Sequence, residues 1–536
     1  MATISLPLQF AASYTNLDQY PNKVVLRSNH GSSQLRALRD RLRARAPRLL
    51  VGDADTHIPI RDILLDGKVK KNNLDSDDAL KEWLDDHSTS DPLQPERRIG
   101  ESATKADPRC RFVFLTADTV TSPLKISLRS LERLFSYHQV SPNFLDFLDV
   151  YGSLAAKDSE LRFSGFREEL YLQNPHPGTI CPDLSRSGRH FQLCYNLKTV
   201  VLKDPDPQSL IPWKIRQDVI HHQFDAGTGV QLWIFGDPHA VMQALIAEAF
   251  NEHKNCRDKF ATVSQSFRSS LEVHLETARW AAGGWRQHIL SLEDKIEKLT
   301  SPFVFQTDPL TSHIDPRDLF LVQAYEDKTN ETTMVLESNI DNMESLCTFY
   351  RDLVKDEGFP NPERHLCSQS VKTFCSRIRE LTYDGKMQVR RAQVLAKRVA
   401  DQKTIFIQLL QTQAGLRAEG LSSIMWRQGK KNSYEAIAMR VITVITLLYL
   451  PPTFVSTIFS TDIVKYQGDD GQLNVEAFSS LALQRWLMVC LPLMAFTLLA
   501  AFGWYWHERA EIRKDTARLE ENYPDTFNKS ISTDSW

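Results

Sequence analysis

The pattern of apolar positions changes sharply near the end of the chain. Residues 441–458 and 487–504 are almost wholly apolar, and a short acidic loop joins them. Each run is about as long as a helix that crosses a bilayer, once flanking residues are counted. No other stretch of the sequence comes close. The pattern therefore predicts a C-terminal hairpin of two membrane-spanning helices, with most of the chain on one side of the membrane.

A single helical pattern leads into the first of these spans. Beyond residue 365, apolar residues recur three and four positions apart, as in a helix packed in a bundle or coiled coil. We expect a stalk helix over 366–432 that continues into a two-span transmembrane domain over 433–508. The two spans are expected at about 436–459 and 485–506, followed by a basic cytosolic tail over 509–536.

The remainder of the chain has the texture of a mixed domain. Residues 111–116, 190–202 and 230–235 are strand-like runs of aromatic and β-branched residues, and helical patterns lie between and after them. The predicted fold class is an α/β cytosolic domain plus a long α-helical stalk leading into a two-helix C-terminal transmembrane hairpin. The expected boundaries are a variable N-terminal region and linker over 1–108, the α/β domain over 109–238, and a helical part over 239–365.

Charge sets the expected orientation and excludes one class of partner. Lysine and arginine cluster before the first span and after the second, which places both termini in the cytosol. We expect a multi-pass protein of the plasma membrane rather than of an organelle. The formal net charge of -3 over 536 residues argues against nucleic-acid binding. The 8 cysteines form no CxxC pair, which indicates reduced thiols. No nucleotide-binding or hydrolase motif is present, so we expect neither an enzyme nor a cofactor.

The first span carries hydroxyl groups on one face of an otherwise apolar helix. On a helical wheel this face contains Met439, Thr443, Thr446, Leu450, Thr453 and Thr457, with Ser460 at its edge. Such a stripe can line a hydrated path, with the apolar members as constrictions. Alternatively, the threonines bond back to carbonyl groups of their own helix or hold helices together. One two-span subunit cannot enclose a pore, so the path requires an oligomer.

The order of these parts resembles the CorA-type divalent-metal transporters, and in particular their fungal CorA-like relatives. Residues 439–463 (MRVITVITLLYLPPTFVSTIFSTDI) are similar to the family's segment that ends in P-x-T-F and then Gly-Met-Asn. Residues 137–151 (YHQVSPNFLDFLDVY) and 163–169 (FSGFREE) resemble the fungal subgroup. Family members are homopentamers in which the first span lines the pore. The resemblance thus implies transport of Mg²⁺ or a related divalent cation along the same stripe that the wheel identifies.

The sequence departs from the family at the mouth of the implied pore. Ser460, Thr461 and Asp462 stand where the family has Gly-Met-Asn, and Ala436 stands where a pore-lining asparagine is expected. Asp462 would offer the cation a carboxylate in place of an amide. The family also binds regulatory metal at acidic stalk residues, a role that Asp401 could take. A second reading is a non-conducting, membrane-anchored scaffold or receptor on the CorA frame, which the altered mouth favours and the hydroxyl stripe does not.

Overall fold

The structure is a computed structural model. It describes residues 6–522 except 28–29, 88, 91–97, 100–102, 119–121, 153–162, 204–211, 237–239, 250–256, 305–315 and 461–479. The chain divides into two compact units, residues 1–410 and residues 411–536, which are described separately below.

A seven-stranded sheet forms the centre of the first unit. Its strand order is β2-β1-β5-β9-β8-β7-β6, and every neighbouring pair is antiparallel except β5 and β9, which are parallel. The strands are β1 (Ile58–Ile63), β2 (Val69–Leu74), β5 (Cys110–Leu115), β6 (Phe166–Tyr171), β7 (His190–Leu202), β8 (Trp213–Asp225) and β9 (Gln231–Gly236). A separate short pair joins β3 (Thr89–Ser90) to β4 (Arg98–Ile99).

The predicted strands at 111–116, 190–202 and 230–235 are confirmed as β5, β7 and β9 to within one residue at each end. Strand β8 has no counterpart among the predicted strands. Its thirteen residues include Lys214, Arg216 and Asp218 and two adjacent histidines, so the apolar pattern that marks a buried strand is broken. Pairing with β7 along its whole length and with β9 along half of it determines its structure instead.

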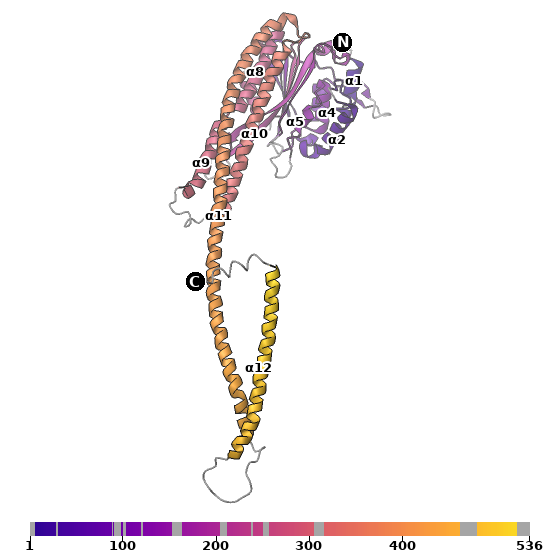
Figure 1. Cartoon of the computed structure of the whole chain (residues 1–536). Coiled ribbons are helices and arrows are strands. Elements are labelled where there is room, and N and C mark those ends of the chain that lie inside the picture. The colour runs from indigo at the N-terminus through magenta and orange to yellow at the C-terminus, as the bar shows by residue number, and fades with distance from the viewer. Residues whose placement is uncertain are drawn as a thin grey trace. The chain divides into compact units, whose positions relative to one another are not determined.

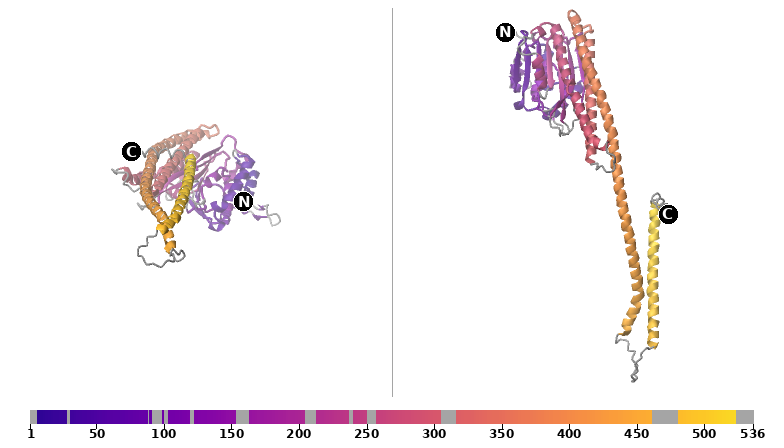
Figure 2. Two further views of the ribbon diagram at one scale, coloured as in Figure 1. Left: turned by 60° about the horizontal axis from the view of Figure 1, so that its bottom comes forward. Right: turned by 90° about the vertical axis from the view of Figure 1, so that its left-hand side faces the viewer.

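Helices cover both faces of the sheet (Figures 1 and 2). One face packs against α8 (Val263–Ala282), α10 (Pro316–Leu353) and the first part of α11, in a core that contains Phe191, Trp233 and Phe267. The other face packs against α4 (Leu128–His138) and its neighbours, in a core that contains Phe135, Phe144 and Ile234. The helices on this face are completed by α1 (Leu8–Thr15), α2 (Ser32–Leu49), α3 (Asp77–Trp83) and α5 (Phe144–Leu148).

The N-terminal hundred residues are part of this sheet domain. Strands β1 and β2 lie at one edge of the sheet, where β1 pairs with β5, and Phe10, Leu42 and Trp83 are buried in the shared core. The structure therefore differs from a division at residue 108. The physical reason is that β1 supplies the antiparallel partner that β5 needs on its free side.

Three further helices precede α11 in the chain. They are α6 (Val241–Ala249), α7 (Arg257–Phe260) and α9 (Trp285–Val304). Helix α9 packs with α10 and α11 around a third core that contains Trp285, Val335 and Ala392. The helical part predicted for this region is thus a bundle that extends the layer of helices formed by α10 and α11 on one face of the sheet.

The second unit consists of the last part of α11 and of α12. Helix α11 runs from Asn361 to Ser460, 100 residues, and α12 from Ser480 to Asn522. Both are long and apolar enough to cross a membrane, with windows of mean hydropathy 1.8 in α11 and 2.0 in Leu483–His507. Helix α11 contains Pro451 and Pro452 and continues through them. The predicted stalk and first span are therefore one uninterrupted helix.

Candidate functional site

The six predicted pore-lining residues all lie on α11 and none is covered by α12. Met439 and Leu450 are about two-thirds exposed, and the side chains of the four threonines are exposed as well. Thr443, Thr446, Thr453 and Thr457 follow the three- and four-residue spacing of a single helix face. The structure thus presents the stripe as one continuous surface, which we call the threonine face.

A different face of α11 packs against α12. Pro451 and Val455 are buried, and Leu447 and Phe459 are half-buried, which places the contact on residues four apart. From α12, Cys490 is buried in this seam. At about 100° per residue, the seam and the threonine face lie on roughly opposite sides of the helix. The second span therefore packs on the side of the first span away from the threonine face and leaves that face uncovered.

A tryptophan hydrogen bond adds to the seam. Trp486 of α12 donates from Nε1 to the Oγ of Ser456, 3.1 Å away. Ser456 is beside Val455 in the chain, so this bond fixes the position of the second helix near the loop that joins the spans.

The threonine hydroxyls donate to their own helix. Thr443 Oγ1 donates to the carbonyl of Met439 (2.7 Å), Thr453 Oγ1 to those of Tyr449 and Leu450 (2.9 Å each), and Thr457 Oγ1 to that of Phe454 (2.8 Å). Back-bonding, one of the two alternatives left open by the sequence, is therefore present. It does not remove the other, because a hydroxyl that donates inward still has oxygen lone pairs that point outward as acceptors.

The predicted mouth is described only at its first residue. Ser460 is the last residue of α11, and its Oγ donates to the carbonyl of Thr457 (3.0 Å). Thr461 and Asp462 lie outside the described residues. Ala436 is exposed on α11, three residues before Met439, and brings no polar atom to the threonine face.

Asp401 is exposed on the part of α11 that belongs to the first unit. In the described ranges, no group of three or more histidine, cysteine or acidic side chains is arranged to hold a metal ion. A regulatory metal at Asp401 stays a prediction, and it would need ligands from elsewhere.

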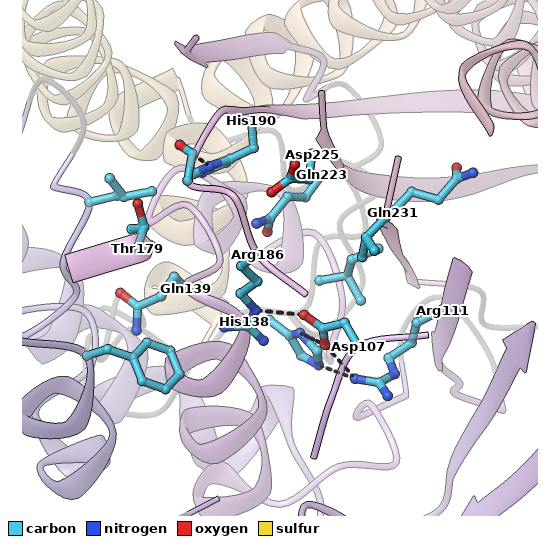
Figure 3. Close-up of a pocket in the computed structure, with 15 residues that line it drawn as sticks. Asp107, Arg111, His138, Gln139, Thr179, Arg186, His190, Gln223, Asp225 and Gln231 are labelled. Carbon is cyan, nitrogen blue, oxygen red and sulfur yellow. Dashed lines mark hydrogen bonds and ion pairs between the residues drawn. The ribbon is translucent and has the colours of Figure 1, made fainter. Parts of the chain in front are cut away.

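A small, partly enclosed cavity in the first unit is lined by charged groups that the sequence did not single out (Figure 3). Asp107 accepts hydrogen bonds from Arg186 Nε (2.6 Å) and Arg111 Nη1 (3.1 Å). Burial alone would raise the pKa of Asp107, but the adjacent guanidinium groups of Arg186 and Arg111 lower it. His138 accepts from Arg111 at 3.4 Å, and burial holds its pKa well below the ordinary value, so it is neutral. The cavity of about 40 Å³ has room for a few water molecules.

This ion network is structural in character. Its members come from β5, α4 and the loops beside them, and their charges are balanced within the network: two guanidinium groups surround Asp107, and Arg111 also pairs with Asp62 (2.9 Å). No local motif could have identified it, because its residues are separated by up to 124 positions in the chain and share no spacing. It links β1, β5 and α4 to the segment that carries Arg186.

Comparison with known proteins decides the family. The model of the family described as CorA-like transporters matches residues 12–304, more than half of the chain. The chain belongs to the CorA-like transporter family. The predicted family is confirmed, and membership implies transport of divalent cations. The match covers the sheet domain with α8 and α9 and ends before α10, so it does not include the threonine face.

Two solved structures are similar to this chain. One is the CorA magnesium transporter from Methanocaldococcus jannaschii, with 9% identity, 83% of this chain and 96% of that chain covered, and a TM-score of 0.30. The other is the ZntB cytoplasmic domain from Vibrio parahaemolyticus, with 12% identity, 65% and 98% covered, and a TM-score of 0.24. These scores are too low to relate individual positions. No curated protein sequence matches the chain.

Proposed function

We propose that this protein conducts divalent metal cations, Mg²⁺ or a related ion, through an oligomeric pore lined by the threonine face of α11. The observation that carries the proposal is that the two sides of the helix have different surroundings. Apolar residues bind α12 on one side, and hydroxyl groups are left exposed on the other. An anchor with no path for ions has no need for exposed hydroxyl groups in an apolar span.

The hydrogen-bond directions suit a hydrated cation. Mg²⁺ releases its water ligands reluctantly, and those waters present O–H donors outward. Each threonine has already used its own hydrogen on a helix carbonyl, so its oxygen meets such a water as an acceptor. Met439 and Leu450 interrupt the row of oxygens with apolar side chains, which would close a narrow path by dewetting.

An oligomer is supported by the apolar side chains that one copy leaves uncovered. On the segment of α11 that precedes the span, Leu421, Ile424, Met425 and Trp426 are all more than half exposed. A row of this kind in a water-facing helix is typical of a surface that binds a partner. Together with the resemblance given above, this supports a homopentamer, with five copies of α11 around one axis.

The orientation follows from charge. Basic residues flank the hairpin on the side of both termini, which supports cytosolic termini and a short loop outside. We place the protein in the plasma membrane. The mouth would be formed by Ser460, Thr461 and Asp462, and five Asp462 carboxylates would attract divalent cations more strongly than amides do.

Uptake of Mg²⁺ into liposomes that contain the purified protein tests the proposal. We expect uptake by the wild type and its loss in Asp462→Ala. Glu476→Gln, which removes a second acidic group from the same loop, is the matched control and should conduct. Asp462→Asn shows how an amide at the mouth changes the preference among Mg²⁺, Co²⁺, Ni²⁺ and Zn²⁺.

The competing function is a non-conducting, membrane-anchored scaffold or receptor, which Ala436 favours because it removes a polar group from the stripe. A correctly inserted oligomer that transports none of the four ions would establish that alternative and refute the transporter.

A further inference from the structure

Two cysteines from different helices meet where α11 packs against α10. Cys347 lies on α10 and Cys375 on α11, and both are buried, with 6% and 3% of their surface exposed. The Sγ of Cys375 donates to the carbonyl oxygen of Cys347, 3.7 Å away, and the two thiols interact with each other. The two cysteines are 28 residues apart in the chain, so no short sequence motif identifies them as a pair.

Arginine side chains surround this pair. Arg351 follows Cys347 by one turn on α10 and hydrogen-bonds to Cys375, and Arg379 follows Cys375 by one turn on α11. The hydrogen bond from Cys347 and the two guanidinium groups together lower the pKa of Cys375 to about 7 against the effect of burial. Cys367, two turns earlier on α11, differs in this respect, because burial raises its pKa to about 12.

A groove open to solvent is lined by residues one helical turn from each cysteine. It is lined by residues of both helices, among them Arg351, Val354, His365 and Val371, and encloses about 800 Å³. Val371 precedes Cys375 by one turn, and Arg351 follows Cys347 by one turn. A small oxidant can therefore come within one helical turn of the sulfur atoms without unfolding of either helix.

We propose that Cys347 and Cys375 form a redox site, in which hydrogen peroxide converts the thiol pair into a reversible disulfide between α10 and α11. The Cys375 thiolate attacks one peroxide oxygen, the O–O bond breaks, and the hydroxide that leaves takes up a proton to become water. Cys375 is then a sulfenic acid. The sulfur of Cys347 attacks the sulfur of Cys375, and the S–O bond breaks. The thiol proton of Cys347 leaves with the hydroxyl as a second water.

The geometry matches the roles that this reaction requires. An attacking thiolate needs a low pKa and nearby positive charge, which Cys375 has, and the resolving thiol must already be in contact, as Cys347 is. The product would join α11, the helix that carries the threonine face, to the sheet domain through α10. The chemistry of the site does not depend on the proposed function, so the thiols themselves provide the readout.

The test uses reduced full-length protein in detergent at pH 7. After addition of hydrogen peroxide, remaining thiols are blocked with N-ethylmaleimide and peptides are analysed by mass spectrometry with and without dithiothreitol. We expect a peptide pair joined through Cys347 and Cys375 that dithiothreitol separates. Cys367→Ser removes another buried thiol of α11 and should leave the cross-link intact.

Two further variants separate the roles of the cysteines. In Cys347→Ser the hydroxyl group keeps a hydrogen bond to Cys375, so Cys375 should accumulate as a sulfenic acid that dimedone traps. In Cys375→Ser, Cys347 should stay reduced. Alkylation by iodoacetamide at pH 7 should be at least about tenfold faster at Cys375 than at Cys367, because the thiolate reacts. The proposal is overturned if both thiols of the wild type remain free, or if peroxide oxidises Cys347 in the Cys375→Ser variant.

Discussion

At the scale of single residues, the buried histidines between the sheet and α8 make the stability of the protein depend on pH. His274 bonds to the hydroxyl groups of Tyr195 (2.7 Å) and Tyr350 (2.8 Å), and its Nε2 is also 3.1 Å from His222 Nδ1. Burial lowers the pKa of His274 to about 3. The unfolded chain takes up the proton near pH 6.5, so stability is full above that pH and is lost as pH falls from 6.5 toward 3.

This linkage gives a quantitative prediction for His274→Gln, which keeps a donor and an acceptor but does not titrate. When the pH falls from 7.5 to 5.5, protonation of His274 in the unfolded chain should lower the unfolding free energy of the wild type by about 1.4 kcal/mol. The variant should not show this loss. Urea unfolding followed by the fluorescence of tryptophan, including the buried Trp233, measures both. His365→Gln changes an exposed histidine and should retain the wild-type pH dependence. Equal slopes for His274→Gln and the wild type would contradict the argument.

A group of neighbouring residues could be predicted from the sequence when all its members lie on one helix or strand. The threonine face lies on one helix, so its period alone groups Thr443, Thr446, Thr453 and Thr457, and the structure places all four as exposed residues of α11. The contacts of His274 with Tyr195 and Tyr350 join a helix, a strand and a second helix. No spacing records such contacts, and the same is true of Cys347 with Cys375. Tertiary packing creates these sites.

At the scale of elements, the two faces of α11 should respond differently to the loss of one hydroxyl group. Thr453→Val is nearly isosteric and removes an oxygen from the threonine face, so cation uptake should fall by about three- to tenfold, as expected for about 1 kcal/mol on the barrier. Ser456→Ala instead removes the acceptor of the Trp486 bond and should weaken the hairpin by about 0.6 kcal/mol without changing uptake per inserted protein. Liposome uptake normalised to inserted protein distinguishes the two. A greater loss of uptake in Ser456→Ala than in Thr453→Val would show that the ions do not pass along the threonine face.

The elements that could be predicted are those whose own pattern is strong. Strands β5, β7 and β9 are runs of aromatic and β-branched residues, and α11 has sustained helical spacing. Strand β8 contains His221, His222 and Asp218 and is held in place by its neighbours, so its local sequence does not identify it. In the same way, the short strands β1 and β2 become visible as sheet members only through their pairing with β5.

At the scale of the whole molecule, the boundary between the two units falls within a helix and not in a linker. Up to Leu410, apolar residues of α11 such as Val371, Phe374 and Phe406 are buried in the cores of the first unit. Beyond it, over residues 411–446, nearly every side chain of α11 is exposed. The sequence alone could not place this change, because the apolar spacing continues through it. The change of surroundings, not of secondary structure, separates the units.

This boundary predicts where the chain can be cut. Residues 1–410 should form a soluble, folded protein with the pH dependence argued for His274, because every core of the sheet domain is retained. Residues 1–360 should not fold, because they lack Val371, Phe374 and Ile378, each of which contributes about 1.5–3 kcal/mol by burial. The sum of such losses over α11 approaches the whole stability of a domain, about 5–15 kcal/mol. Circular dichroism and cooperative urea unfolding compare the two fragments. A cooperative transition in residues 1–360 would show that α11 is an attachment to the sheet domain, whereas failure of both fragments would show that the sheet domain requires the membrane hairpin or its oligomer.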